Sequence, residues 1–216
     1  NSFINWSHRI YGLCIWICLL KKITYKMNNY SWLQQKLHQI VLSSQFIREV
    51  TFDVESSAIL KKQSTDNHIF VAGLARSGTT ILLNALYKSD EFASLSYQDM
   101  PFVLAPNLWS KLSFSKKGMD FIERAHGDGI KVSSESPEAF EEGFWMTFNE
   151  SDEDTQEKFK TYVQLINQKY HKERYLSKNN QNIRRLELIS VIFPRSKIFI
   201  PYRNPIQHAY SLLSQH

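Results

Sequence analysis

The amino-acid sequence predicts an α/β domain of three layers, in which helices cover both faces of a central parallel sheet. Short apolar runs rich in β-branched and aromatic residues alternate with stretches of helical periodicity along most of the chain. The first of these runs leads through a glycine-containing turn into a helix, a connection typical of α/β units. The chain has 216 residues, which is room for one domain of this class.

The first half of the chain is predicted to contain two strands. A helix over 31–48 is predicted from the capping-box pattern of Ser31 and Gln34 and from the apolar spacing that follows. The polar stretch 61–67 then forms a loop. The predicted strands are 68–73 and 92–97, and the predicted helices after them are 79–87 and 100–112. Pro106 should break or kink the last of these helices.

The second half of the chain continues the alternation of helices and strands. The predicted helices are 159–171, 183–193 and 206–214, and the predicted strands are 174–177 and 196–202. Strands that alternate with helices form parallel sheets with right-handed crossovers. Neither an internal repeat nor a low-complexity linker divides the chain. Residues 27–216 are therefore predicted to form a single domain.

The composition is that of a soluble globular protein, with 43% apolar and 22% charged residues. This balance excludes collagen-like, wholly disordered and disulfide-scaffold classes. The net charge of +5 suggests an anionic partner, but residues 1–26 hold four basic residues and no acidic one, which leaves +1 for the rest. We therefore expect no nucleic-acid partner. Both cysteines, Cys14 and Cys18, lie in the same 26 residues, so the remainder needs no oxidising compartment, and no Cys/His cluster indicates zinc.

The first 26 residues differ from the rest of the chain. The apolar run Ile10–Leu20 has 11 residues, whereas a membrane span needs about 20. No small-residue cleavage site follows this run, because Lys21 and Lys22 come next. We expect residues 1–26 to be a non-native or disordered leader, and the protein to be cytoplasmic without a membrane partner. A short N-terminal membrane anchor is the alternative.

A candidate phosphate-binding loop spans 73–80, between the first predicted strand and the helix after it. Gly78 lets the backbone approach an anion, and the free N–H groups of the first helical turn point toward it. Further donors are the hydroxyls of Ser77, Thr79 and Thr80 and the guanidinium of Arg76. A Walker A loop would carry lysine in place of Thr79, and no apolar strand ends in an aspartate suited to Mg²⁺. A plain glycine turn that caps a helix is the simpler alternative.

A second set of polar residues lies near the carboxyl end of the chain. The predicted strand 196–202 delivers Arg203 to its carboxyl end, where ligands bind open parallel sheets. Asn204 and Pro205 then turn the chain into a helix. Ser211 lies eight residues after Arg203, so its hydroxyl could return toward the same anion. By itself this is an ordinary strand–turn–helix joint, but its combination with the phosphate loop is specific.

Together these two elements resemble the donor-binding elements of sulfotransferases that use 3′-phosphoadenosine 5′-phosphosulfate (PAPS). The family's 5′-phosphosulfate loop has a basic residue, a hydroxyl residue, glycine and two more hydroxyl residues, as in Arg76-Ser77-Gly78-Thr79-Thr80. Its 3′-phosphate element is a strand that ends in a three-residue motif: arginine, then aspartate or asparagine, then proline. A serine follows eight residues after the arginine, as in Arg203-Asn204-Pro205 and Ser211. The resemblance covers about 68–216, is closest to branches that include bacterial enzymes, and implies a P-loop NTPase-like fold. Because family members usually continue beyond this point, we expect the domain 27–216 to be C-terminally incomplete.

The resemblance also implies roles for individual residues. Ser77, Gly78, Thr79 and Thr80 would hold the 5′-phosphosulfate, and Arg76 would stabilise charge on the bridging oxygen. Arg203 and Ser211 would hold the 3′-phosphate. Transfer would be in line and would need no metal, because positioning and electrostatics supply most of the catalysis.

A general base must deprotonate the acceptor. Asp99, after the second predicted strand, is the first candidate for this base, followed by His126 and then by Glu138 or Glu141. Lys178 follows the third predicted strand, where family members often carry a lysine that reaches the donor or the acceptor. A solvated surface lysine is the alternative at that position.

The expected function is transfer of a sulfuryl group from PAPS to a hydroxyl or amine. The acceptor would be a small molecule, a carbohydrate, a lipid or a peptide, and its identity depends on variable loops within 107–160. Two alternatives remain open. One is a P-loop nucleotide-binding protein without sulfuryl transfer, and the other is an inactive sulfotransferase fragment.

Overall fold

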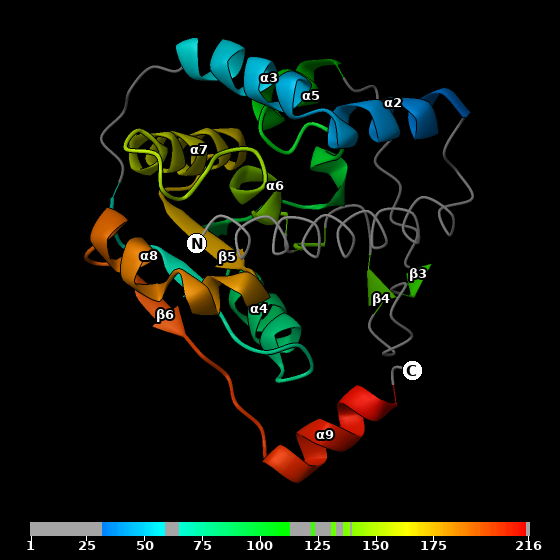
Figure 1. Cartoon of the computed structure of the whole chain (residues 1–216), viewed down its shortest axis with the longest axis vertical. Coiled ribbons are helices and arrows are strands. Elements are labelled where there is room, and N and C mark those ends of the chain that lie inside the picture. The colour runs from blue at the N-terminus through cyan, green and yellow to red at the C-terminus, as the bar shows by residue number, and fades with distance from the viewer. Residues whose placement is uncertain are drawn as a thin grey trace.

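A computed structural model describes residues 32–58, 65–112, 122–123, 131–132, 136–138 and 140–214. The predicted leader 1–26 and the capping residue Ser31 lie outside these ranges. Four parallel strands form the central sheet in the order β2-β5-β1-β6 (Figure 1). The strands are β1 (Ile69–Val71), β2 (Phe92–Ala93), β5 (Arg174–Lys178) and β6 (Lys197–Phe199). A separate antiparallel pair consists of β3 (Ile122–Glu123) and β4 (Lys131–Val132).

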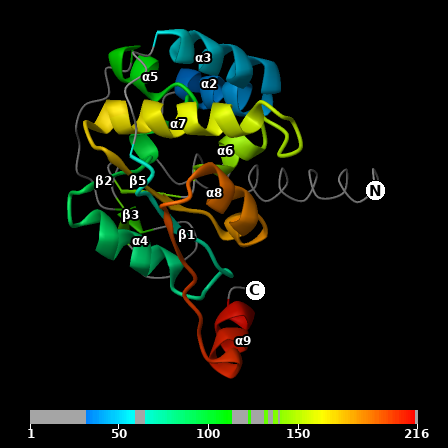
Figure 2. The same cartoon turned by 90° about the vertical axis from the view of Figure 1, so that its left-hand side faces the viewer.

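Helices cover both faces of the sheet, with α4 on one side and α7 and α8 on the other (Figure 2). The helices are α2 (Trp32–Ser43), α3 (Gln45–Ser57), α4 (Thr79–Tyr87), α5 (Pro106–Leu112), α6 (Glu142–Trp145), α7 (Thr155–Tyr170), α8 (Leu186–Ile192) and α9 (Pro205–Leu213). Two short 3₁₀ turns, η1 (Tyr97–Asp99) and η2 (Asn180–Arg184), follow β2 and β5. Among the helices of the described residues, none is both long enough and apolar enough to cross a membrane.

The two faces of the sheet pack into separate apolar clusters because successive side chains of a strand point to opposite faces. Ile69, Val71 and Leu176 pack with Leu83 of α4. Phe70 points the other way, into the larger cluster beneath α7 and α8. The three-layer α/β architecture with a parallel sheet is therefore confirmed.

The larger cluster is built mainly from aromatic rings. Phe159 of α7 is fully buried, and its ring centroid lies 4.5 Å from that of Trp145, 5.1 Å from that of Phe144 and 5.8 Å from that of Phe193. Phe193, at the end of α8, stacks on Phe70 of β1 with centroids 5.9 Å apart. The aromatic residues of the sequence thus tie α6, α7 and α8 to the centre of the sheet.

Two predicted helices depart most from the structure. The helix predicted over 31–48 is two helices, because the Ser44 side chain accepts a hydrogen bond from the backbone N–H of Ile47 and starts α3 as its N-cap. The helix predicted over 100–112 is shorter and begins at Pro106. Proline suits the first turn of a helix, where its missing N–H costs nothing.

The buried His68 makes the stability of the fold sensitive to acid. Its Nδ1 accepts a hydrogen bond from the backbone N–H of Tyr175 at 3.1 Å, and its Nε2 lacks a partner among the described residues. Burial, helped by the charge of Arg174, lowers the pKa of His68 from 6.5 to about 4. Between pH 6.5 and pH 4, His68 therefore binds a proton in the unfolded chain but stays neutral in the folded chain. The free energy of unfolding should fall by up to about 3 kcal/mol as the pH decreases through this window.

Replacement of His68 by asparagine tests this pH dependence. Asparagine offers an oxygen to the N–H of Tyr175 and does not titrate, so His68→Asn should flatten the pH dependence of the unfolding free energy in this window. Urea unfolding at a series of pH values measures it. The exposed His171 provides the control, since His171→Asn should leave the dependence as in the wild type. An equally steep acid loss in His68→Asn would contradict the prediction.

Candidate functional site

The predicted phosphate loop joins β1 to α4 in the structure. The Ser77 hydroxyl donates a hydrogen bond to the carbonyl of Leu74 at 2.7 Å, and the Ser77 N–H points to the same carbonyl at 3.3 Å. Arg76 adopts a left-handed backbone conformation with a φ of 68°. Gly78 forms the N-cap of α4. The loop therefore folds back on itself and leaves its carboxyl end at the start of a helix.

The two glycines of the loop serve different purposes. Gly78 has a φ of 101°, which L side chains rarely adopt, and apart from its two chain neighbours no described residue has an atom within 4 Å of the place where a Cβ would sit. Gly73 has close neighbours instead, since a Cβ there would lie 3.3 Å from Ser77 Oγ and 3.4 Å from the carbonyl oxygen of Pro201. Gly73 thus permits close packing, and Gly78 leaves room beside the first turn of α4.

The second element is the segment from β6 to α9. The Asn204 side chain caps α9 by accepting hydrogen bonds from the N–H groups of Ile206 at 3.0 Å and Gln207 at 3.4 Å. Pro205 occupies the first helical turn, as the Asn-Pro sequence predicts. Arg203 is exposed on the segment 200–204, which carries the chain away from the sheet to α9 (Figure 1).

The two elements meet in space, although they are far apart in sequence. Arg76 Nε donates a hydrogen bond to Ser211 Oγ at 3.0 Å across 135 positions. A second contact joins His208 Nε2 to the carbonyl oxygen of Ala75 at 2.6 Å. Both contacts run from the phosphate loop to α9. The structure therefore brings α9, with Ser211 of the second half-site, to the predicted phosphate loop.

Lys178 lies at this same edge and is not a solvated surface lysine. It is the last residue of β5, it is 7% exposed, and its Cα pairs in register with that of Val71 at the end of β1. Its Nζ lies 3.6 Å from Glu138 Oε1, and the Tyr97 hydroxyl donates to Glu138 Oε2 at 3.2 Å. A buried ion pair thus stands one strand away from the phosphate loop.

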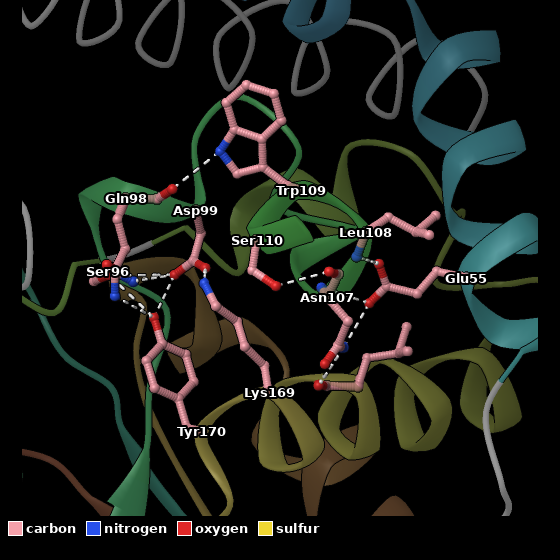
Figure 3. A network of polar contacts seen from close by, with 11 residues as sticks. Glu55, Ser96, Gln98, Asp99, Asn107, Leu108, Trp109, Ser110, Lys169 and Tyr170 are labelled. Carbon is pink, nitrogen blue, oxygen red and sulfur yellow. Dashed lines mark hydrogen bonds and ion pairs between the residues drawn. The ribbon is translucent and has the colours of Figure 1, made fainter. Parts of the chain in front are cut away.

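Asp99 lies in a different environment, which Figure 3 shows. It is fully buried and completes a capping box with Ser96, whose backbone N–H donates to Asp99 Oδ2 at 2.7 Å. Tyr170 donates to the same oxygen at 2.6 Å, and Lys169 forms an ion pair with Oδ1. Burial raises the pKa of Tyr170 to about 12, so its hydroxyl stays a donor. These contacts have the form of a structural carboxylate, and the role of Asp99 as the base stays a prediction.

The same view shows how the segment after Asp99 is held (Figure 3). Glu55 of α3 is buried and accepts hydrogen bonds from the backbone N–H groups of Asn107 at 3.0 Å and Leu108 at 2.8 Å. These N–H groups belong to the first turn of α5, which leaves them without partners inside the helix. The carboxylate therefore caps α5 from a neighbouring helix, a contact that the sequence pattern did not indicate.

Of the remaining candidates for the base, Glu141 also has the contacts of a structural carboxylate. Glu141 is buried and accepts hydrogen bonds from Trp145 Nε1 at 3.0 Å, Asn182 Nδ2 at 2.8 Å and the Tyr175 hydroxyl at 3.1 Å. It therefore ties α6 to β5 and η2. His126 lies outside the described residues.

Two residues of the site were missed in the sequence. Asn180, just after β5, faces the start of α4, where Thr79 Oγ1 lies 3.4 Å from Asn180 Oδ1. His208 contacts the phosphate loop from α9, as described above. The polar pair Asn179 and Asn180 at the end of a predicted strand is the sequence signal that could have indicated Asn180. Among the described parts of the chain, no group of three or more His, Cys, Asp or Glu side chains could hold a metal ion.

A loop between strand and helix with the sequence form of a phosphate-binding loop, and a helix that returns to it, therefore define an α/β protein with a parallel sheet. The sequence profile described as the sulfotransferase family matches residues 68–216, and the chain belongs to that family. No curated protein matches the chain significantly.

Two solved structures resemble the fold. Sulfotransferase STF9 from Mycobacterium avium matches with a TM-score of 0.52 and 15% identity, over 88% of this chain and 57% of that one. Sulfotransferase STF1 from Mycobacterium tuberculosis H37Rv matches with a TM-score of 0.51 and 14% identity, over 92% of this chain and 63% of that one. At these identities the likeness concerns the fold. The chain spans about three fifths of the length of these two proteins.

Proposed function

We propose that this protein transfers a sulfuryl group from PAPS to the hydroxyl or amine of a small-molecule, carbohydrate, lipid or peptide acceptor, and that it acts in the cytoplasm. Membership of the sulfotransferase family supports the reaction class. The observation that carries the proposal is the hydrogen bond between Arg76 and Ser211, because it joins the loop expected at the 5′-phosphosulfate to the helix expected at the 3′-phosphate.

The phosphate loop would bind the 5′ end of the donor. The N–H groups at the start of α4 and the hydroxyls of Thr79 and Thr80 supply donors there, and the open side of Gly78 leaves room for the anion. The Arg76 guanidinium would stabilise the charge that grows on the bridging oxygen as the sulfur–oxygen bond breaks.

The segment from β6 to α9 would bind the other end of the donor. Arg203 and Ser211 supply a guanidinium and a hydroxyl, two groups suited to a phosphate monoester. Because ATP has no 3′-phosphate, this end would distinguish the sulfuryl donor from ATP.

Affinity chromatography on immobilised adenosine 3′,5′-bisphosphate tests the donor class. The protein should be retained, and it should be eluted by free adenosine 3′,5′-bisphosphate but not by ATP. Elution by ATP alone would contradict the proposal and would favour a nucleotide-binding protein without sulfuryl transfer.

The contribution of Arg203 is a separate prediction. Arg203→Ala should weaken binding of adenosine 3′,5′-bisphosphate about 10- to 100-fold, which corresponds to the loss of a charge-assisted hydrogen bond. Adenosine 5′-monophosphate, which lacks the 3′-phosphate, should bind the variant and the wild type equally. Isothermal titration calorimetry with both nucleotides measures the difference.

Arg195 offers a matched control for this measurement. It is an exposed arginine before the amino end of β6, whereas Arg203 lies beyond its carboxyl end. Arg195→Ala should therefore bind both nucleotides as the wild type does. An equal loss for both nucleotides in Arg203→Ala would mean that Arg203 does not contact the 3′-phosphate.

A further inference from the structure

We propose that Glu138, held by Lys178 and Tyr97, is the general base that takes the proton of the acceptor. The proposal rests on the proposed sulfuryl transfer and names the carboxylate that serves it. The three observations that carry it are the position of Glu138 at the carboxyl edge of the sheet, its ion pair with Lys178, and the different partners of the other buried carboxylates.

The backbone fixes Glu138 beside the carboxyl end of β2. Its N–H donates to the carbonyl of Leu95 at 3.1 Å, and Pro137 forms an antiparallel bridge with Ser96. Leu95 is two residues beyond Ala93, which pairs with Tyr175 of β5. Lys178 is three residues beyond Tyr175, so Glu138 and Lys178 stand at the same level of the sheet.

The order of the strands then sets the order of the groups along this edge. Glu138 stands beside β2, Lys178 ends β5, and the phosphate loop follows β1, and these three strands are neighbours in the sheet. Lys178 therefore ends the strand that lies between the carboxylate and the loop that would hold the donor. An acceptor placed next to the sulfuryl group would have its proton facing Glu138.

The contacts of the carboxylate suit a base that must stay ionised although it is only 6% exposed. Lys178 Nζ at 3.6 Å supplies the opposite charge that a buried carboxylate needs, and the Tyr97 hydroxyl at 3.2 Å fixes the second oxygen. Negative charge at the phosphate loop would draw the ammonium toward the donor and so free the carboxylate for the proton.

The step balances with these groups. As the acceptor oxygen forms its bond to sulfur, its proton passes to the Glu138 carboxylate. The bond between sulfur and the bridging oxygen breaks, and its electron pair leaves on the 5′-phosphate, whose charge Arg76 and Lys178 would stabilise. The products are the sulfated acceptor, adenosine 3′,5′-bisphosphate and a proton that Glu138 releases to solvent.

The alternative carboxylates serve other contacts. Asp99 accepts hydrogen bonds from Ser96 and Tyr170, and the lysine that pairs with it is Lys169 of α7 rather than Lys178. Glu141 is held by three donors from α6, β5 and η2. Among these three acidic candidates, Glu138 is the one paired with the lysine at the carboxyl edge.

The test uses the full chain and needs no knowledge of the acceptor. Release of radiolabelled sulfate from PAPS measures transfer to water, and calorimetry with adenosine 3′,5′-bisphosphate measures the donor site separately. Glu138→Gln should keep the affinity for adenosine 3′,5′-bisphosphate and lose about 100-fold or more of the rate of sulfate release. Glu141→Gln, which also removes a buried carboxylate, should lower the melting temperature without this selective loss of rate.

The outcomes separate the failure of this inference from that of the proposed function. A wild-type chain that does not bind the bisphosphate would overturn the donor site, and the proposed base with it. A chain that binds the bisphosphate but releases no sulfate would overturn the proposed sulfuryl transfer, and the proposed base with it. A Glu138→Gln variant that releases sulfate at the wild-type rate would overturn the role of Glu138 alone. A selective loss of rate in Asp99→Asn rather than in Glu138→Gln would assign the base to Asp99.

Discussion

Replacement of Phe159 by alanine is expected to destabilise the protein by about 3–5 kcal/mol. Phe159 is fully buried, and its ring lies against those of Trp145 and Phe144 in α6 and of Phe193 at the end of α8. Alanine would leave a cavity at the point where α6, α7 and α8 meet the sheet, and the surrounding structure relaxes only partly around a cavity of this kind. Chemical unfolding followed by fluorescence of the tryptophans measures the loss.

Phe46 is the matched control for Phe159. It is a phenylalanine on α3 whose side chain is 72% exposed. Phe46→Ala should change the free energy of unfolding by about 0.5 kcal/mol or less, because the ring is already in water. A similar small change for Phe159→Ala would show that the aromatic cluster does not hold the layers together.

Replacement of Arg76 by alanine is expected to reduce sulfuryl transfer about 10²- to 10³-fold. The charge on the bridging oxygen grows in the transition state, so the rate should fall by more than the affinity for adenosine 3′,5′-bisphosphate. Sulfate release from PAPS measures the rate, and calorimetry measures the affinity.

Arg76→Lys refines this measurement. Lysine keeps the positive charge but loses the planar fork that contacts Ser211, so the rate should lie between those of the wild type and Arg76→Ala. Arg195→Ala again serves as the arginine control. An Arg76→Ala variant with the wild-type rate would show that the guanidinium does not face the leaving group.

The local elements of the site were predictable because their signals lie within a few residues of one another. The helix over 79–87 agrees with α4, and the prediction of a turn before it agrees with the strained backbone at Arg76 and Gly78. The Asn-Pro sequence at 204–205 predicted the start of α9 in the same way. Glycine, proline and capping side chains act on their own neighbours, so the sequence reveals them.

Long-range contacts were less predictable. The break at Ser44 separates two helices where the apolar spacing suggested one, and the cap on α5 comes from Glu55 in a distant helix. The position of Asp99 just after the second predicted strand makes it the first candidate for the base, and this role stays a prediction. In the folded chain, the capping box turns Asp99 toward α7, and a segment about 40 residues later brings Glu138 to Leu95.

The sequence by itself determined the fold class, the turn before α4 and the start of α9, because each depends on periodicity and turn residues read over short distances. The tertiary structure alone decided that Arg76 meets Ser211 and that Lys178 pairs with Glu138. The physical reason is that both contacts depend on the order β2-β5-β1-β6, which the packing of α4, α7 and α8 against the two faces of the sheet sets. Neighbours in that order come from distant parts of the chain, so their side chains meet only after the layers have assembled.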